Sequence, residues 1–280
     1  MVEVIVADEA GACYGVERAL ELVREEASRN EGPVYTLGPL IHNPVVVGEL
    51  DELGVRVTGD AAVEAGATLV LRTHGVTPQV EEQARAAGAR VLDATCPFVK
   101  RVHRAAERLV REGYQLIVVG ESGHPEVEGI VGHVPEAAVV GSASEVEGLE
   151  LARKVGVVVQ TTQARANLSA IVSALAGRVD ELRVLNTICD ATSGHQNACA
   201  RLASMVDVMV VVGGRNSANT THLAEISAQH CSRTHHIEVP GELDATWFDG
   251  AIRIGVTAGA STPAAHIEAV VDAIKALTEH

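Results

Sequence analysis

The chain alternates short apolar runs with longer amphipathic stretches over its whole length. Runs rich in Val and Ile, such as VEVIVAD, QLIVVG and VDVMVVVGG, are typical of the buried strands of a parallel sheet. Each run is followed by a small or polar loop and then by an Ala-rich segment with helical periodicity. This order of elements predicts an α/β protein built from parallel sheets.

Three kinds of strand–loop–helix unit recur in the same order along the chain. In the first kind the strand leads to a cysteine, and these cysteines are Cys13, Cys96 and Cys189. In the second kind a glycine precedes a histidine or a hydroxyl/amide group, and the residues are His42, His124, Ser217 and Asn219. In the third kind the strand ends near a Thr, His or Ser, and the residues are His74, Thr161 and Ser261.

The spacing of these units repeats as well. The second kind follows the cysteine after 29, 28 and 28 residues, and the cysteines are 83 and 93 residues apart. We therefore predict three similar α/β lobes with approximate threefold symmetry, formed by residues 1–96, 97–189 and 190–280. In this division Cys96 and Cys189 stand at the starts of the second and third lobes. Because ligands bind at the carboxyl ends of parallel strands, the loops are expected to face one shared centre.

Composition and charge narrow the possible functions. Of the 280 residues 47% are apolar, which is enough for a buried core. The formal charge of −15 and the six aromatic residues argue against nucleic-acid binding, which needs clustered cations and stacking platforms. The acidic first residues are unlike a secretory leader, and no apolar run reaches membrane-spanning length. We expect a soluble, cytoplasmic protein with no nucleic-acid or membrane partner.

The cysteines favour a soft metal centre over disulfides. Five dispersed cysteines are an odd number, and no C-x-x-C pair is present. Three thiolates at matching loop positions suit either an iron–sulfur cluster or zinc. Three ligands on a four-iron cluster would leave one iron open for substrate, which is a feature of a catalytic site. The alternative is that each cysteine is a small buried hydrophobe.

The other loop residues suggest an anion pocket with a nearby acid. Seven uncharged or weakly basic donors are placed where helices begin, and helix N-termini bind phosphate groups well. Each of these residues could instead be an ordinary helix cap. Glu126 in GHPEVEG is a candidate proton source, and Thr161 a candidate relay or hydroxyl-binding residue. The alternative for Glu126 is an acid favoured in the first turn of a helix.

Eight segments together resemble one family. They are ACYGVERA, RTHGV, DATCPFVKRVH, GHPEVEG, VVVQTTQ, ICDATSGHQNA, VVGGRNSANTTHLAE and GVTAGASTP. In this order and spacing they are similar to the 4-hydroxy-3-methylbut-2-enyl diphosphate reductases, the LytB/IspH family. The resemblance runs from Cys13 nearly to the end of the chain.

The resemblance implies a three-lobed fold around a central [4Fe–4S] cluster held by Cys13, Cys96 and Cys189. It implies two-electron reductive dehydroxylation of the allylic diphosphate to isopentenyl and dimethylallyl diphosphates, the last step of the non-mevalonate isoprenoid pathway. Glu126 and Thr161 would deliver protons, and ferredoxin or flavodoxin would supply electrons. An acidic carrier would need a local basic patch, which we do not locate in the sequence. The residues implied to bind the diphosphate are His42, His74, His124, Ser217, Asn219 and Ser261.

Four positions depart from the family pattern: Ala12, Asp190, His195 and Ala218. Ala218 stands where a second serine is usual, so one hydroxyl of the diphosphate site is missing. Two alternatives therefore stay open beside the family reaction. One is a paralogue that reduces a related allylic diphosphate, and the other is a cluster-based sensor without enzymatic activity.

Overall fold

The computed structural model describes residues 2–29 and 31–279 and contains three four-stranded parallel sheets in this part of the chain. Contacts divide the chain into two compact units. Unit 1 consists of Met1–Val16, His42–Gly48 and Asp190–His280. Unit 2 consists of Glu17–Ile41 and Glu49–Cys189. The prediction of an α/β fold with parallel sheets is confirmed.

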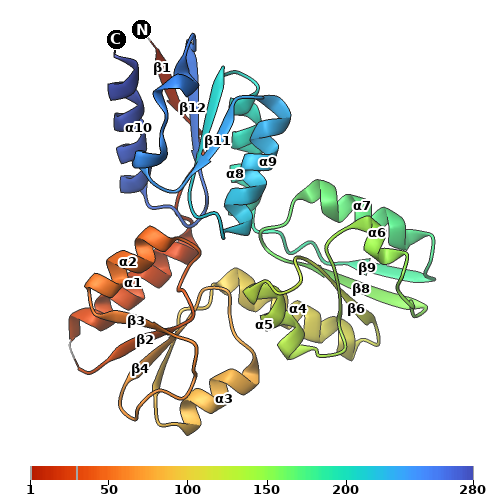
Figure 1. Cartoon of the computed structure of the whole chain (residues 1–280). Coiled ribbons are helices and arrows are strands. Elements are labelled where there is room, and N and C mark those ends of the chain that lie inside the picture. The colour runs from red at the N-terminus through yellow and green to blue at the C-terminus, as the bar shows by residue number, and fades with distance from the viewer. Residues whose placement is uncertain (1, 30, 280) are drawn as a thin grey trace. The chain divides into compact units, whose positions relative to one another are not determined.

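Unit 1 contains one sheet with the strand order β1-β12-β10-β11 (Figure 1). Its strands are β1 (Glu3–Val6), β10 (Val208–Val212), β11 (Thr234–Ile237) and β12 (Arg253–Ala258). Its helices are α8 (Asp190–Ala203), α9 (Ala218–His230) and α10 (Ala264–Thr278), with short 3-10 turns η1 (Pro240–Glu242) and η2 (Ala245–Phe248).

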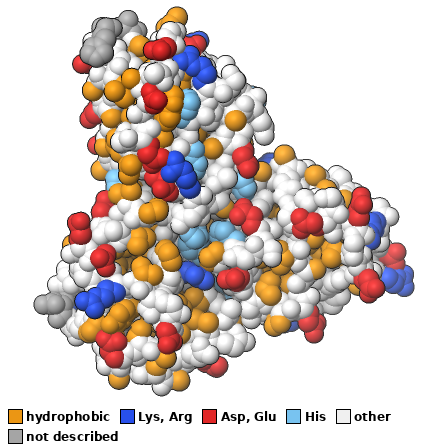
Figure 2. Space-filling view, in the orientation of Figure 1, with side chains coloured by type: hydrophobic (Ala, Val, Ile, Leu, Met, Phe, Trp, Pro, Cys, Tyr) orange, Lys and Arg blue, Asp and Glu red, His pale blue; other side chains and the backbone are white. Residues whose placement is uncertain are grey.

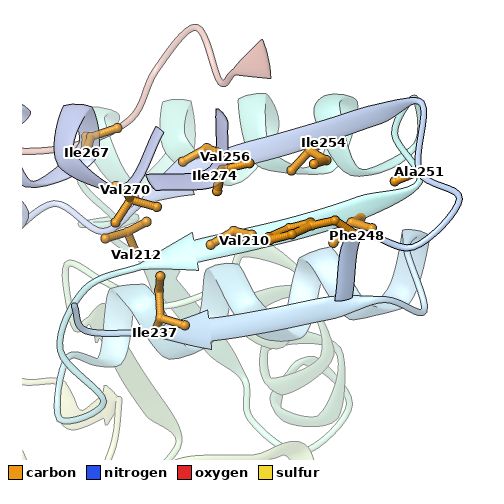
Figure 3. Close-up of a cluster of buried hydrophobic side chains, with 12 residues drawn as sticks. Val210, Val212, Ile237, Phe248, Ala251, Ile254, Val256, Ile267, Val270 and Ile274 are labelled. Carbon is orange, nitrogen blue, oxygen red and sulfur yellow. The ribbon is translucent and has the colours of Figure 1, made fainter. Parts of the chain in front are cut away.

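Alternating residues of β10 give this sheet two buried faces. Val210 and Val212 pack with Val270 and Ile274 of α10 (Figure 3). The intervening Val211 packs in a second cluster with residues of α8 and α9. A strand buried on both faces reads as a continuous apolar run, which explains the VDVMVVV segment.

Unit 2 contains two sheets, with strand orders β3-β2-β4-β5 and β7-β6-β8-β9 (Figure 1). The first is formed by β2 (Val34–Leu37), β3 (Val55–Thr58), β4 (Thr68–Leu71) and β5 (Arg90–Asp93). The second is formed by β6 (Gln115–Val119), β7 (Ala138–Val140), β8 (Lys154–Val159) and β9 (Glu181–Val184). The helices are α3 (Pro78–Ala86), α4 (Pro97–Arg111), α5 (Pro125–His133), α6 (Ala143–Val146) and α7 (Arg165–Ala176). Two further helices, α1 (Tyr14–Arg29) and α2 (Pro44–Glu52), begin in unit 1 and continue into unit 2.

The second sheet of unit 2 is covered on both faces. Leu116 and Val118 of β6 pack in one cluster with residues of α4 and α5. Ile117 and Val119 pack in another cluster with residues of α7. This packing fixes the helices α4 and α5, which carry or follow several of the candidate site residues.

The three sheets have the same strand order when each strand is classified by the kind of loop that follows it, as defined in the sequence analysis. The strand that leads to a cysteine (β1, β5 or β9) is at one edge, and the strands of the third and second kinds lie next to it in that order. The fourth strand (β11, β3 or β7) forms the other edge. The repeat found in the sequence is thus a repeat of sheet topology.

The sheets, however, divide the chain differently from the predicted lobes. The predicted first lobe joins residues 3–6 to residues up to 96, but β1 pairs with β12, with Glu3 opposite Arg253. Cys96 and Cys189 follow the last strands of their sheets, so each cysteine ends a sheet unit where we expected it to begin the next one. The reason is that the edge strand before each cysteine pairs with a strand of the third kind. For β5 and β9 this partner, β4 or β8, comes earlier in the chain, whereas β1 pairs with β12 near the other end of the chain.

The described residues include no helix that is both long and apolar enough to cross a membrane. The face seen in Figure 2 carries acidic side chains over all of its parts, as the charge of −15 implies.

Candidate functional site

The three candidate ligand cysteines have the same local structure. Cys13, Cys96 and Cys189 each directly precede a helix, α1, α4 and α8 respectively. Each backbone N–H donates to a carbonyl in the loop after the neighbouring strand: Cys13 to Ala260 O (3.1 Å), Cys96 to Thr73 O (3.0 Å) and Cys189 to Thr161 O (3.0 Å). Three separate sheets therefore present a thiol in one repeated geometry at the positive end of a helix, where negative charge is favoured.

The exposure of the cysteines separates ligands from core residues. Cys13, Cys96 and Cys189 are partly exposed and form no disulfide, whereas Cys199 and Cys231 are buried. Cys199 packs in the core of unit 1 and its Sγ lies 3.0 Å from Ser227 Oγ. Accessible thiols at helix N-termini are the donor set that an iron–sulfur cluster takes, so these residues fit such a group.

Grouping of these thiols around one centre stays a prediction. Cys96 and Cys189 belong to unit 2, and Cys13 belongs to unit 1. Within residues 2–29 and 31–279, no three His, Cys, Asp or Glu side chains are grouped so that they could hold a single metal ion.

Glu126 and Thr161 form a buried pair in unit 2. Glu126 is only 2% exposed. Its Oε1 accepts from the Thr161 N–H (2.7 Å) and its Oε2 from the Thr161 hydroxyl (2.8 Å). Sequence reasoning named both residues, and the structure brings them into direct contact.

Burial raises the pKa of the Glu126 carboxyl from 4.5 to about 7. The two hydrogen bonds from Thr161 oppose this shift, and the negative charge of Glu121 adds to it. A carboxylic acid with a pKa near neutrality can both hold and release a proton at physiological pH.

This shift predicts a pH-dependent stability. Because the folded-state pKa lies above the ordinary value, folding favours the protonated form, so the contribution of Glu126 is lost as the pH rises from 4.5 to about 7. The free energy of unfolding of the wild type minus that of Glu126→Gln should fall by about 3 kcal/mol as the pH is raised from about 4 to about 8. Urea unfolding of both proteins at the two pH values measures the difference. An identical pH dependence in both proteins would contradict the shifted pKa.

His124 adjoins this pair, and His74 lies next to His124. His124 is the N-cap of α5, and its Nδ1 accepts from the Glu126 N–H (3.1 Å). The neutral ring therefore carries its proton on Nε2 and can donate with that atom. The rings of His74 and His124 are 5.7 Å apart and nearly perpendicular. Two loops, one from each sheet of unit 2, thus bring their histidines together.

In unit 1, Ser217 and Asn219 are at the start of α9. The Ser217 side chain caps the helix by accepting from the Thr220 N–H (3.3 Å). Asn219 is 3% exposed, and neither its amide nitrogen nor its amide oxygen has a hydrogen-bond partner among the described residues. Since a buried unpaired amide is costly, this side chain indicates a ligand that supplies the missing partner.

Ser261 and His42 also belong to unit 1 and are joined directly. The Ser261 hydroxyl donates to the His42 carbonyl (3.2 Å). Gly214 permits this loop packing, because a Cβ at this position would lie 2.5 Å from the same carbonyl. In this unit the structure brings the loops of His42, Ser217 and Ser261 together.

Sequence reasoning missed Asn43, which holds these loops. Its Oδ1 accepts from the N–H groups of Val45 and Val46 at the start of α2, and its Nδ2 donates to Ser261 O (2.9 Å). An Asn directly before Pro44, the first residue of a helix, is a capping signal that could have identified it.

The residues that depart from the family pattern differ in their surroundings. Asp190 is exposed in the first turn of α8, where the helix dipole favours an acid. Ala218 is buried next to Ser217 and Asn219. His195 is buried, and this burial lowers the pKa of its ring.

The fold and the site define a protein of three parallel α/β sheets, each with a thiol before a helix, and with hydroxyl, amide and imidazole groups on the neighbouring loops. Residues 4–275 match the family described as LytB protein. The chain therefore belongs to the LytB family.

Relatives of known name agree with this assignment. The chain is 47% identical over 277 residues to the 4-hydroxy-3-methylbut-2-enyl diphosphate reductase of Geobacter sp. (strain M21), covering 98% of each chain. It is 45% identical over 285 residues to the enzyme of the same name from Aquifex aeolicus (strain VF5), covering 100% of this chain and 98% of the relative.

Two solved structures are similar along nearly the whole chain. One is (E)-4-hydroxy-3-methyl-but-2-enyl diphosphate reductase, the terminal enzyme of the non-mevalonate pathway. It is 44% identical, with a TM-score of 0.73 over 99% of this chain and 100% of that one. The other is the E-1-hydroxy-2-methyl-but-2-enyl-4-diphosphate reductase of Plasmodium falciparum. It is 28% identical, with a TM-score of 0.93 over 98% of this chain and 88% of that one.

Proposed function

We propose that this protein reduces 4-hydroxy-3-methylbut-2-enyl diphosphate to isopentenyl and dimethylallyl diphosphates, the last step of the non-mevalonate pathway. The reaction breaks the allylic C–O bond, forms a C–H bond, consumes two electrons and two protons, and releases water. The observation that carries the proposal is the buried Glu126–Thr161 pair, because a reductive dehydroxylation needs a positioned proton source. The names of the relatives specify the substrate.

Cys13, Cys96 and Cys189 would hold a [4Fe–4S] cluster. Their repeated position before a helix and their partial exposure support this assignment. When bound, the cluster supplies single electrons to the substrate. Ferredoxin or flavodoxin would supply these electrons from outside the chain.

Glu126 and Thr161 deliver protons in this proposal. With a pKa of about 7, Glu126 is partly protonated at neutral pH, and in that state its O–H can donate to Thr161 Oγ1. The Thr161 hydroxyl is then able to donate onward to the leaving hydroxyl of the substrate. Because Glu126 is almost completely buried, its proton reaches the substrate through Thr161.

The diphosphate would be bound by uncharged or weakly basic donors on the loops that follow the strands. Helix N-termini and imidazole, hydroxyl and amide groups bind phosphate oxygens without a large excess of cations. His124 can donate from Nε2, and Asn219 has donor capacity that the described residues do not use. The residues assigned to the diphosphate are His42, His74, His124, Ser217, Asn219 and Ser261.

Replacing Asn219 with Leu tests this assignment. Removing an unpaired buried amide should leave the free energy of unfolding unchanged or raise it by about 1 kcal/mol, while KM for the diphosphate rises about tenfold or more. Asn167 is the matched control, because its amide donates to Gly141 O and to Gln163 Oε1, so Asn167→Leu should destabilise the fold and leave KM unchanged. A destabilised Asn219→Leu protein with normal KM would remove Asn219 from the substrate site.

Anaerobic turnover tests the function itself. Protein with a reconstituted cluster and a strong one-electron chemical reductant should convert 4-hydroxy-3-methylbut-2-enyl diphosphate to both C5 diphosphates. An intact cluster with no conversion would contradict the proposal. The missing hydroxyl at Ala218 would then direct attention to related allylic diphosphates.

A further inference from the structure

Helix α4 links a candidate cluster ligand to the surface of unit 2. Cys96 is its N-cap, and Val102, Ala106 and Leu109 pack against the sheet that contains β6 and β8. The opposite side of the helix is exposed. Residues on that side start within about 8 Å of Cys96 along the helix axis, at 1.5 Å per residue.

This exposed side is strongly basic. In its 15 residues α4 carries five basic residues and one acidic residue, in a chain with a net charge of −15. Four exposed arginines, which we call the arginine stripe, follow the spacing i, i+3, i+7, i+10, so they lie on one side of the helix. The stripe consists of Arg101, Arg104, Arg108 and Arg111.

The charge of the stripe is largely not neutralised within the protein. Arg104 and Arg111 donate to the backbone carbonyls of Lys100 and Glu107, and Arg101 lies 5.3 Å from the centre of the Phe98 ring. In the described part of the chain none of these three forms a salt bridge with a carboxylate.

The two glutamates within and directly after α4, Glu107 and Glu112, have other partners. Arg108 makes only a long contact of 3.9 Å with Glu112, which also pairs with Arg183. Glu107, the single acid of the helix, pairs with His133 (2.8 Å). The positive field of the stripe is therefore directed to solvent.

We propose that the arginine stripe is the docking surface for an acidic protein that carries single electrons. The inference rests on the proposed function, which consumes two electrons that must come from outside the chain. A net charge of −15 disfavours the approach of an acidic carrier to the chain as a whole, and the stripe is a region of opposite sign that favours contact at α4. A carrier bound along α4 would also lie close to Cys96, the N-cap of this helix and a candidate cluster ligand.

Charge reversal tests this surface. In Arg101→Glu/Arg104→Glu/Arg108→Glu, kcat/KM for purified flavodoxin or ferredoxin should fall about tenfold or more at low salt, and the wild-type decline with added salt should disappear. Calorimetric titration with oxidised flavodoxin should show the same loss of affinity. Turnover with dithionite and methyl viologen, which need no docking surface, should stay at the wild-type level.

A control variant separates local from global charge. Arg56→Glu/Arg165→Glu/Arg201→Glu changes three exposed arginines outside α4 and alters the net charge by the same amount. It should keep most of the carrier-driven rate. An equal loss in both variants, or no loss in the stripe variant, would overturn the proposal.

The same experiments distinguish this inference from the function on which it rests. If the wild type shows no turnover even with the chemical reductant, the proposed function fails. If that turnover is normal and the stripe variant has the wild-type kcat/KM for the carrier, only the proposed docking surface is wrong. Tight binding of a double-stranded DNA oligomer by the wild type, lost in the stripe variant, would reassign the surface to nucleic acid and overturn the proposal.

Discussion

Replacing Glu126 with Gln is expected to lower turnover by about 100-fold to 10,000-fold, the usual contribution of a positioned general acid. Gln has nearly the same shape, and its amide oxygen can accept the Thr161 N–H as Oε1 of Glu126 does at 2.7 Å. The fold and the thiols should thus be unaffected, and cluster content should stay at the wild-type level. Anaerobic steady-state kinetics, together with iron and sulfide analysis of the same samples, measures both expectations.

Glu128 provides the matched control. It is on the same helix two residues away, but its side chain is exposed and makes no contact with Thr161. Glu128→Gln should therefore turn over at close to the wild-type rate. Near-normal turnover in Glu126→Gln would remove this carboxyl from the mechanism.

Replacing Cys96 with Ser should abolish both the cluster and the turnover. A hydroxyl is a hard and weakly acidic donor that replaces thiolate poorly on iron. Misfolding should not explain the loss, because Cys96 makes no side-chain capping bond and Ser is a preferred N-cap residue. Visible absorbance and iron content after anaerobic reconstitution give the measurement, and thermal unfolding of the apo-protein confirms the fold.

Cys199→Ser is the control for the loss of a thiol. Cys199 is completely buried in the core of unit 1, with Ser227 within hydrogen-bond distance. This variant should bind a full cluster and lose little stability. A full cluster in Cys96→Ser, or the absence of a cluster in Cys199→Ser, would refute the assignment of ligands.

The sequence was sufficient for the local architecture. Short Val-rich runs between polar loops are typical of buried parallel strands, and the recurrence of Cys, His and hydroxyl residues marked the carboxyl ends of three strands in each sheet. Glu126 and Thr161 were also each identified from the loops that carry them, whereas their direct contact is seen only in the structure. These features are predictable because each depends on a strand end and the helix that follows it.

Features that depend on distant pairing were not predictable in this way. β1 pairs with β12 about 250 residues away, and nothing in the segment EVIV distinguishes this partner from β4 or β2. Asn43 ties its helix to Ser261 across a similar separation. The arginine stripe could have been identified from its spacing, but only the structure shows which side of α4 is covered by the sheet.

The pairing of β1 with β12 also sets an order of events during synthesis. Both sheets of unit 2 consist of residues between Val34 and Val184, so they can form while the chain is still being made. β1 and Cys13 emerge from the ribosome first but gain their sheet only when residues 253–258 have been translated. Cys13 therefore gains its neighbouring strand later than Cys96 and Cys189, whose strands β5 and β9 pair within unit 2.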